Sequence, residues 1–401
     1  MVLQGKHIVL GVCGSIACYK AADLASKLVQ AGAVVDVVLT ESAQKFVTPF
    51  TFRSLTGRAP YTDMFEPVTD TGEEHVALSR RADLIIVAPA TATTMAKLAH
   101  GLADDMLSLT VLATKAPVLV APAMDSQMWA AAATQENLDT LRRRGVEFVG
   151  PESGRLASGN IGAGRMSEPM TILGAAKALL ARTGDLAGRH IVVSAGGTRE
   201  PIDPVRVLTN RSSGKMGYAL AEAARDRGAR VTLVSTIDSL PVPYGVERVP
   251  VETVSEMRTV VLEACESAHV LIMAAAMSDF RPVDVAEHKI KKSEGDELVL
   301  RMVQNRSFFP EVPDRLVKVA FAAESRDVIE NALRKPLSHG RLDLICANDV
   351  SAEGAGFGVD TNLVTLLEPG RESEALDLMS KYDVSVRILD RVKTILERRG
   401  G

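Results

Sequence analysis

The sequence has few cysteines and no excess of basic residues, and each shortage excludes a class of protein. Its four cysteines, Cys13, Cys18, Cys265 and Cys346, are scattered and form no CxxC pair. This argues against a zinc site and against a disulfide framework. Lysine and arginine number 46 against 50 aspartates and glutamates, so the net charge is −4. Without a basic surplus to follow a phosphate backbone, nucleic-acid binding is not expected.

Long apolar runs are also missing. No run reaches about 18 residues, the length that spans a bilayer, so no membrane segment is expected. The first residues, MVLQGKHIVLGVCGS, lack the long apolar stretch and cleavage site of a secretory signal peptide. The 401 residues are 46% hydrophobic and 24% charged, which is typical of folded domains and is enough chain for two or three of them. We therefore expect a cytoplasmic protein with sizeable cores.

Short apolar runs bounded by glycine or proline alternate with longer helical patterns in the first half. The runs are nearly continuous in Val, Ile and Leu, as in strands that are covered on both faces of a parallel sheet. They lie at residues 7–12, 34–39, 84–88, 117–121 and 146–149, with helical patterns at 16–31, 93–103 and 128–144. This alternation predicts an α/β, doubly wound fold.

The same alternation restarts near residue 190. Strands are expected at residues 190–194, 230–234, 270–274, 317–322, 342–347 and 363–367, and an amphipathic helix at 383–396. The polar, glycine-containing stretch 183–188 is typical of a domain junction. We therefore expect two doubly wound Rossmann-like domains, residues 1–183 and 189–401, with a linker at 184–188. Their ligands should bind at the carboxyl ends of the strands.

The first expected strand runs into a glycine turn, GVCGSIACYK, that opens a helix. Such a turn presents free N–H groups and a positive dipole end to a phosphate. It is not GxGxxG, and the second strand ends in Thr40 instead of the acidic residue that a ribose diol needs. A mononucleotide such as FMN therefore fits better than NAD. An ordinary strand-to-helix turn is the alternative.

Four further segments of the first half have two interpretations each. The hydroxyls of PATATT, residues 89–94, either cap a helix or bind a phosphate or flavin edge. His75 is either a surface residue or a group for acid–base chemistry or anion anchoring. The segment PAMDSQMW, residues 122–129, either packs a loop or walls a substrate pocket. Residues 150–164 contain five glycines, which predicts a mobile loop, with a lid as one role.

In combination and in this order, the GSIACYK turn, PATA, PxMxxxMW and the glycine-rich flap resemble the homo-oligomeric flavin-containing cysteine decarboxylases. The resemblance implies that FMN oxidises the cysteine thiol to a thioaldehyde, which lets the adjacent carboxylate leave as CO2. The reduced flavin then returns a hydride, with a flap cysteine as proton donor. His75 would take part in the decarboxylation. FMN would bind around Ser15, Thr40, Thr91, Thr93, Thr94 and Ser108.

Two positions depart from that family. The family has asparagine where Asp125 stands, and a carboxylate there repels the substrate carboxylate unless one of them is protonated. The flap cysteine corresponds to Ser158, whose hydroxyl is a far weaker acid than a thiol of pKa about 8.5. Three outcomes stay open: a decarboxylase that works with altered residues, one that stops at the oxidised enethiol, or a flavin-binding relic.

The second half carries three polar segments at expected strand ends. Asn210 begins NRSSGKMG, an anion site at a helix start that lacks the GxxxxGK spacing of a Walker A loop; a plain capped helix is the alternative. Asp279 follows another strand, where a carboxylate can hold Mg²⁺ or a nucleotide hydroxyl. Lys289 and Lys291 share one face of an extended segment and suit a triphosphate; a solvated hairpin is the alternative.

These segments resemble the phosphopantothenate–cysteine ligase, so the whole chain resembles the bifunctional decarboxylase–ligase family of coenzyme A biosynthesis. By that resemblance, CTP and Mg²⁺ activate the carboxylate of 4′-phosphopantothenate as an acyl-cytidylate, which the amine of cysteine attacks. Asn210 would bind the acyl-cytidylate, Lys289 would counter phosphate charge, and Asp279 would hold the metal. The nucleotide pocket would include Met273, Ala274, Ala275, Asp279, Lys289, Phe321 and Lys335. A homo-oligomer with trimeric decarboxylase and dimeric ligase contacts is expected.

The ligase half departs from its family as well. The family sequence Asn-Pro-Asp-Ile is replaced by NRSFF at residues 305–309, and a later lysine pair is reduced to Lys335. Arg306, Arg334 or Arg341 would supply the missing positive charge. Three alternatives to a bifunctional enzyme stay open. They are a ligase with an FMN-binding oligomerisation module, a non-enzymatic flavin-binding regulatory protein, and a dinucleotide oxidoreductase, which the missing GxGxxG opposes.

Overall fold

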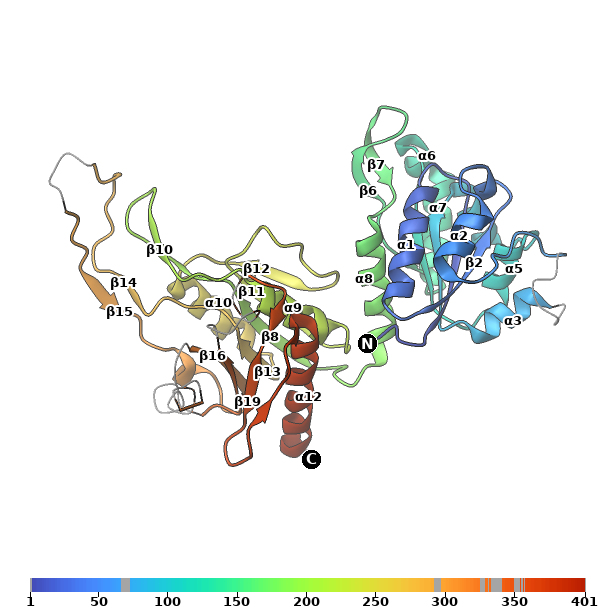
Figure 1. The fold of residues 1–401 in the computed structure, drawn as a ribbon. Coiled ribbons are helices and arrows are strands. Elements are labelled where there is room, and N and C mark those ends of the chain that lie inside the picture. The colour runs from blue at the N-terminus through green and yellow to red at the C-terminus, as the bar shows by residue number, and fades with distance from the viewer. Residues whose placement is uncertain are drawn as a thin grey trace. The chain divides into compact units, whose positions relative to one another are not determined.

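The computed structural model of the protein describes residues 2–65, 73–291, 297–324, 329–330, 332, 341–349, 354, 356 and 358–400. The chain divides into two compact units, Met1–Leu180 and Ala181–Gly401. Each unit has its own sheet with helices packed on it, parallel in the first unit and mostly parallel in the second (Figure 1). The α/β fold with two doubly wound sheets that the sequence predicts is therefore confirmed.

The first unit is built, in its described part, on a five-stranded parallel sheet in the order β2-β1-β3-β4-β5. The strands are β1 (His7–Val12), β2 (Val34–Leu39), β3 (Leu84–Ala90), β4 (Val118–Pro122) and β5 (Glu147–Phe148). Alternate residues of β1 enter opposite cores, with Ile8 and Leu10 on one side and Val9 on the other. Burial on both faces explains why these strands are continuous apolar runs.

Helices cover both faces of this sheet. One core contains side chains of α1 (Cys18–Gln30), α2 (Pro49–Thr56) and α8 (Pro169–Leu180). The other contains side chains of α3 (Glu74–Arg81), α4 (Ala92–His100), α5 (Met106–Ala113) and α7 (Ala132–Arg143). A short turn, η1 (Ala43–Lys45), follows β2, and η2 (Ala181–Thr183) follows α8.

Two segments of the first unit differ from the expectation. The helix expected at 128–144 is two helices, α6 (Ser126–Ala130) and α7, because Ala131 between them is extended, with φ −60° and ψ 134°. The glycine-rich segment is not a loop but an antiparallel hairpin of β6 (Glu152–Arg155) and β7 (Ile161–Arg165). Its turn is closed by the N–H of Leu156 donating to the carbonyl of Asn160 at 2.8 Å.

The second unit holds, among its described residues, an eight-stranded sheet in the order β12-β11-β8-β13-β16-β17-β19-β20. Neighbours from β12 to β17 are parallel, and β19 and β20 add antiparallel strands at one edge. The strands are β8 (His190–Ala195), β11 (Arg230–Ser235), β12 (Glu247–Pro250), β13 (Val270–Met273), β16 (Val317–Glu324), β17 (Leu344–Asp349), β19 (Val364–Leu367) and β20 (Glu374–Ala375).

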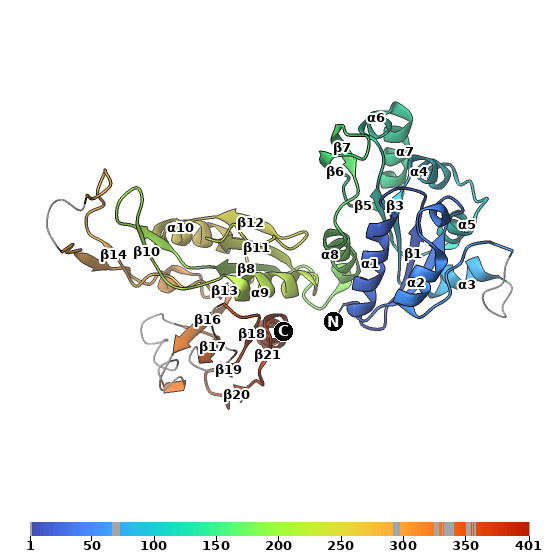
Figure 2. The same ribbon diagram turned by 45° about the horizontal axis from the view of Figure 1, so that its top comes forward.

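Helices α9 (Lys215–Arg225) and α12 (Lys381–Gly400) pack on one face of this sheet, and α10 (Val254–Cys265) packs on the other. Three small ribbons are formed by β9 (Arg199–Pro201) with β10 (Val207–Thr209), β14 (Phe280–Pro282) with β15 (Met302–Gln304), and β18 (Thr361–Asn362) with β21 (Met379–Ser380). The first two ribbons lie side by side beyond the sheet (Figure 2). A turn, η4 (Phe309–Glu311), precedes β16. Within the described ranges, the search for a helix able to cross a bilayer finds none.

Candidate active sites

The strand order of the first sheet places a switch point between β1 and β3, because the chain continues from them to opposite edges. The loops after these strands carry Ser15 and Thr91. The N–H of Cys13 donates to the carbonyl of Pro89 at 3.2 Å and joins the two loops. Ligands of doubly wound sheets bind at such a point, at the carboxyl ends of the strands.

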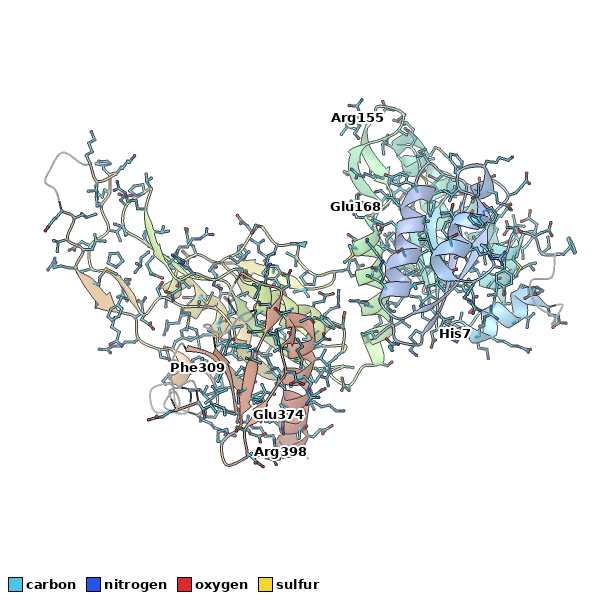
Figure 3. The ribbon with its side chains drawn as sticks, in the orientation of Figure 1. His7, Arg155, Glu168, Phe309, Glu374 and Arg398 are labelled. Atoms are coloured by element: carbon cyan, nitrogen blue, oxygen red, sulfur yellow. The ribbon has the colours of Figure 1, made fainter. Side chains whose placement is uncertain are left out.

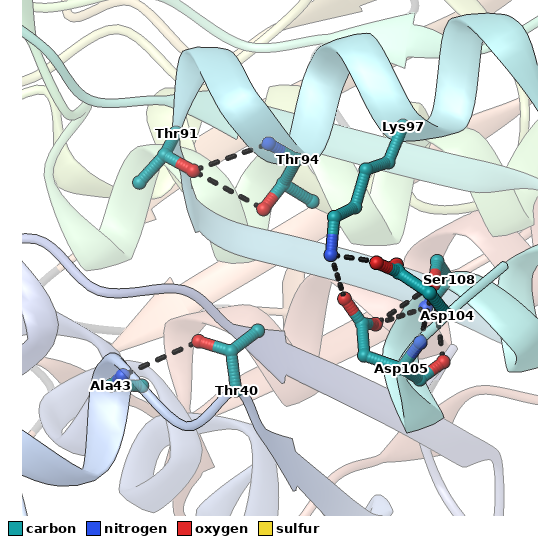
Figure 4. A network of polar contacts seen from close by, with 8 residues as sticks. All are labelled: Thr40, Ala43, Thr91, Thr94, Lys97, Asp104, Asp105 and Ser108. Atoms are coloured by element: carbon teal, nitrogen blue, oxygen red, sulfur yellow. Dashed lines mark hydrogen bonds and ion pairs between the residues drawn. The ribbon is translucent and has the colours of Figure 1, made fainter. Parts of the chain in front are cut away.

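Several predicted hydroxyls near this point cap helices (Figure 4). Thr91 Oγ1 accepts from the N–H of Thr94 at 3.3 Å at the start of α4. Ser108 is buried and forms a capping box with Asp105 at the start of α5. Thr40 Oγ1 accepts from the N–H of Ala43 at 3.3 Å. A hydroxyl that accepts keeps its own proton, so capping leaves Thr40 able to donate to an anionic ligand.

A cavity of about 410 Å³ lies beside Thr40 and Asp105. Lys97 Nζ bonds to Asp104 at 2.7 Å and to Asp105 at 2.8 Å. Burial raises the pKa of Asp105, but the hydrogen bonds from Lys97 and Ser108 outweigh burial and bring the pKa below its usual value. Asp105 is therefore a fixed carboxylate at neutral pH. Of the other predicted residues, Thr94 is buried and Thr93 is exposed.

A second cavity of about 410 Å³ in this unit is lined by Ser15, Asp125 and Ser158 together. Ser158 Oγ donates to Asp125 Oδ2 at 2.6 Å. Asp125 also caps α6 by accepting from the N–H of Gln127 at 3.0 Å. The hydrogen bonds from Ser158 and Gln127 lower the pKa of Asp125. The two residues that depart from the decarboxylase pattern are thus direct partners.

The β6–β7 hairpin that carries Ser158 is tied to the sheet at its base. The N–H of Met124 donates to the carbonyl of Gly164 at 3.0 Å. Lys20 is buried, and its Nζ donates to the carbonyl of Met166 at 3.0 Å and to Glu168 Oε1 at 2.9 Å. Figure 3 shows Glu168 between β7 and α8. This role of Lys20 was not predicted from the sequence. The signal that could have indicated it is a lysine at a position within the apolar pattern of the first helix.

His75 lies in the first turn of α3 and is half-buried. It is not among the residues that line the cavity beside Thr40 or the cavity lined by Ser15, Asp125 and Ser158. The structure therefore brings Ser15, Asp125 and Ser158 together and leaves His75 apart from them. Its part in decarboxylation stays a prediction.

The switch point of the second sheet lies between β8 and β13, and a cavity of about 500 Å³ opens there. Five of the predicted residues line it: Asn210, Ala274, Ala275, Asp279 and Phe321. Met273 ends β13 and is buried. Lys289 is exposed between β14 and β15 and is not among the lining residues, and Lys335 lies outside the described residues.

Asn210 and the start of α9 form one wall of this cavity. Asn210 Nδ2 donates to the carbonyl of Met277 at 2.9 Å, which fixes the amide. Helix α9 begins after Gly214 in the left-handed conformation (φ +74°), and no side chain of the described residues caps it. Its first N–H groups therefore stay available to an anion at the positive end of the helix dipole.

The loop that carries Asp279 is held by Asn305. The N–H of Asn305 donates to the carbonyl of Asp279 at 2.7 Å, and its Nδ2 donates to the carbonyl of Ser278 at 2.9 Å. Phe308 and Phe309, at the positions where the sequence departs from the ligase family, are buried in the core. The described residues contain no group of three or more His, Cys, Asp or Glu placed to hold a metal. A metal at Asp279 would take its other oxygen ligands from water or from a bound nucleotide.

Sequence reasoning missed Lys381 and Asn348, which also line the second-unit cavity. Lys381 is buried, and its Nζ donates to the carbonyls of Thr361, at 2.9 Å, and of Val359. Burial, followed by the nearby charge of Lys215, lowers the pKa of Lys381. Asn348 Oδ1 is buried with no hydrogen-bond partner in the described structure. Asn348 directly follows the strand predicted at 342–347, which was a usable signal; Lys381 precedes a predicted helix and offered none.

Comparisons with known proteins match both units. Residues 2–181 match the family "Flavoprotein", and residues 186–396 match "DNA/pantothenate metabolism flavoprotein C-terminal domain". The chain is 45% identical over 399 residues to the coenzyme A biosynthesis bifunctional protein CoaBC of Vibrio vulnificus (strain YJ016), covering 98% of this chain and 99% of that protein. It is 45% identical over 405 residues to the protein of the same name in Bacillus subtilis (strain 168), covering 100% and 99%. A crystal structure of the C-terminal domain of a CoaBC protein is 35% identical, covers 54% of this chain and 99% of its own, and has a TM-score of 0.46.

Proposed function

The chain belongs to the family of the bifunctional coenzyme A biosynthesis proteins, and we propose how its two units divide the reactions. It is an enzyme with a ligase and a decarboxylase activity. The second unit joins 4′-phosphopantothenate to cysteine with CTP and Mg²⁺. The first unit then decarboxylates the 4′-phosphopantothenoylcysteine to 4′-phosphopantetheine with FMN.

The second-unit cavity supports the ligase step. Its volume of about 500 Å³ is in the range of small-molecule sites. The uncapped start of α9 suits the nucleotide phosphates, and Asn210, on the same wall of the cavity, would bind the acyl-cytidylate. Lys289, on its exposed segment, would neutralise phosphate charge as the acyl-cytidylate forms. Mg²⁺, held by Asp279 and phosphate oxygens, would supply further charge neutralisation there.

The loops of the first unit support the flavin step. Ser15, Thr40 and Thr91 stand at the carboxyl ends of three neighbouring strands, and hydroxyls with the free N–H groups of a helix start fit a phosphate-bearing ligand. Gly14 fits this turn because a Cβ there would lie 2.4 Å from the Cβ of Ser42. FMN, when bound, supplies the reversible two-electron oxidation of the substrate thiol. Ser15, Asp125 and Ser158 line the space where this chain would hold the substrate.

We also propose a cytoplasmic location and a homo-oligomeric state, and exposed apolar side chains on the first unit support the second of these. Tyr19, Phe50 and Ile161 are 63%, 74% and 84% exposed. Large exposed apolar side chains gather where proteins meet partners. Trimeric contacts between first units and dimeric contacts between second units are part of the proposal, and light scattering after size-exclusion chromatography measures the assembly.

The meeting of Asn210, Asp279 and the uncapped start of α9 in one cavity carries the proposal. The test is a coupled assay on the purified protein with 4′-phosphopantothenate, cysteine, CTP and Mg²⁺. Its two readouts are the release of pyrophosphate and the mass of the product. 4′-Phosphopantetheine is the expected product. Accumulated 4′-phosphopantothenoylcysteine would contradict the decarboxylase half, and absence of pyrophosphate would contradict the ligase half.

A further inference from the structure

The flap residue Ser158 and the loop residue Asp125 form a hydrogen-bonded pair inside the first-unit substrate cavity. The distance of 2.6 Å between Ser158 Oγ and Asp125 Oδ2 is that of a charge-assisted O–H···O⁻ bond. The two residues are 33 positions apart and come from different elements, the turn between β6 and β7 and the start of α6. Both line the same cavity.

The charges around this pair are unequal. Lys20 from α1 and Arg155 and Arg165 from the hairpin line the cavity, and Asp125 is the one carboxylate among the described residues that line it. Lys20 and Arg165 are both paired with Glu168, at 2.9 Å and 2.7 Å. Asp125 is therefore the acidic side chain that a substrate carboxylate would encounter in this cavity.

We infer that Asp125 and Ser158 act as one proton-carrying pair: Asp125 shares a proton with the substrate carboxylate, and Ser158 passes that proton to the carbon that loses CO2. The inference rests on the proposed decarboxylase function and adds to it the source of the proton. Two carboxylates in one site bind one proton between them, because both cannot stay ionised at close range. The hydrogen bonds from Ser158 and Gln127 lower the pKa of Asp125 and keep it ionised in the free protein, so the shared proton has to be taken up when the substrate binds.

The proton balance of the step is closed by the pair. Decarboxylation converts R–COO⁻ and one proton into R–H and CO2. The bond between the carboxyl carbon and its neighbour breaks, CO2 leaves, and the electron pair stays on the substrate. The shared proton remains on Asp125. Asp125 then donates to Ser158 Oγ while Ser158 gives its own proton to the carbon, so Ser158 is regenerated and Asp125 returns to a carboxylate.

The pair explains how a serine does this work. A lone serine hydroxyl is far too weak an acid to give up a proton, and alkoxide formation is avoided only if it receives one at the same moment. The 2.6 Å contact provides that partner. The close packing of Gly164 on Met124 holds the two elements together, since a Cβ on Gly164 would lie 2.2 Å from the carbonyl oxygen of Met124.

Proton uptake on binding is the first test, and it needs no turnover. The probe is 4′-phosphopantothenoylserine, which has the carboxylate of the substrate but no thiol to oxidise. Calorimetric titration of the flavin-loaded protein in two buffers of different ionisation enthalpy should show uptake of about one proton. Asp125→Asn should abolish the uptake, and Ser153→Ala, at an exposed serine on β6, should keep it. Binding without proton uptake in the unaltered protein would overturn the inference.

Product analysis is the second test. Asp125→Asn and Ser158→Ala should each still release CO2 but yield a product two hydrogens lighter, because the carbon is not protonated in the site. In air, dioxygen then takes the two electrons that the product did not receive. The double variant should resemble either single variant, since the pair acts as one unit. Ser158→Cys on the Asp125→Asn background should restore the full product, because a thiol of pKa about 8.5 donates without a partner.

The outcomes separate the two hypotheses. If the unaltered protein binds flavin and releases pyrophosphate but no CO2, the proposed decarboxylase activity fails and the pair fails with it. If CO2 is released and Ser158→Ala still gives the full product, the decarboxylase stands and only the proton-carrying pair is overturned. Retention of bound flavin shows in every variant that the first unit, which carries the pair, is folded.

Discussion

The carboxylate of Asp203 accepts a hydrogen bond of 3.2 Å from the backbone N–H of Ile290, 87 residues further along the chain. Its other oxygen accepts from the N–H groups of Val205 and Arg206 at 2.8 Å each. Burial alone would raise the pKa of Asp203. The hydrogen bonds from these backbone N–H groups outweigh burial, so the pKa of Asp203 lies below its usual value. Because Ile290 directly follows Lys289, the ionised Asp203 fixes the backbone of the segment that presents Lys289.

Asp203→Asn should therefore impair the ligase although Asp203 does not line the second-unit cavity. The amide puts an N–H group where the backbone N–H of Ile290 and the guanidinium of Arg206 need an acceptor, so the Lys289 segment loses its anchor. We expect kcat/KM for CTP to fall roughly 10- to 100-fold, as for other misplaced charged groups. Pyrophosphate release at varied CTP measures this.

Two comparisons make the Asp203 result specific. Asp284→Asn removes a carboxylate that is 76% exposed and pairs with Arg301, and it should leave the rate unchanged. In the Lys289→Ala background, Asp203→Asn should cost little more, because the two residues act through one contact. Independent, multiplying losses would show that Asp203 does not act by positioning Lys289.

The apolar alternation was sufficient to predict both sheets. Strands β1 and β2 begin and end at the predicted residues. A continuous apolar run of about six residues is most simply explained by a strand that is buried on both faces of a sheet. The break at Ala131 could not be predicted, since the alanine-rich stretch has high helix propensity throughout and the bend depends on how α6 meets β7.

The candidate sites were predictable to the extent that they follow strand ends. Asn210 and Asp279 stood out because their residue types carry chemistry at a predicted strand end, and Asp125 and Ser158 stood out as departures from the decarboxylase family that the sequence resembles. Asp203 and Lys381 did not, because their roles come from backbone groups that tertiary folding brings to them. The hydrogen bond between Asp125 and Ser158 could not be predicted for the same reason. The sequence shows that each residue departs from the decarboxylase family, but not that the two side chains are in contact.

Gly164→Ala should disable the decarboxylase and spare the ligase. Gly164 has φ +153°, and a Cβ there would lie 2.2 Å from a backbone oxygen of Met124, which cannot move aside as a flexible side chain does. Strain of about 1–3 kcal/mol should displace the hairpin from α6 and separate Ser158 from Asp125. CO2 release and product mass measure the loss, and pyrophosphate release should be unchanged.

Gly154→Ala is the matched control on the partner strand β6. A Cβ at Gly154 would meet only the side chain of Arg165, at an ordinary 3.7 Å. This variant should keep both activities. Full decarboxylation by Gly164→Ala would mean that the hairpin does not need its close contact with Met124.

Asp36→Asn should destabilise the first unit. Asp36 lies on β2 with 2% of its surface exposed, and it accepts from Arg58 Nε at 2.6 Å and from Arg81 Nε at 3.0 Å. Losing the charge weakens two charge-assisted hydrogen bonds, which we expect to cost about 1.5–3 kcal/mol of unfolding free energy. Urea unfolding followed by the fluorescence of Trp129 measures it.

Asp23→Asn is the control for Asp36. Asp23 pairs with Lys27 on the exposed surface of α1, and such a pair contributes about 0.5 kcal/mol or less. Equal destabilisation by the two variants would contradict the assignment of Asp36 as a structural charge.

His190→Gln should make the second unit less sensitive to acid. His190 is buried at the start of β8, with Nε2 3.0 Å from Thr232 Oγ1. Burial, followed by the charge of Arg230, lowers the pKa of His190 in the folded protein. The unfolded chain then binds a proton that the folded chain resists, so stability is fully present above the unfolded pKa of about 6.5 and is lost as the pH falls below it.

The measurement is the urea midpoint of the transition that includes the second unit, followed by circular dichroism. Between about pH 7.5 and about pH 5.5, the midpoint should fall less in His190→Gln than in the unaltered protein, because the variant has no imidazole to protonate. His269 also has a pKa lowered by burial and remains in both proteins, so some acid sensitivity persists. Between about pH 7.5 and about pH 8.5, where both states hold His190 neutral, the two proteins should change in parallel. Parallel behaviour in the acid range as well would show that His190 titrates alike in the folded and unfolded chain.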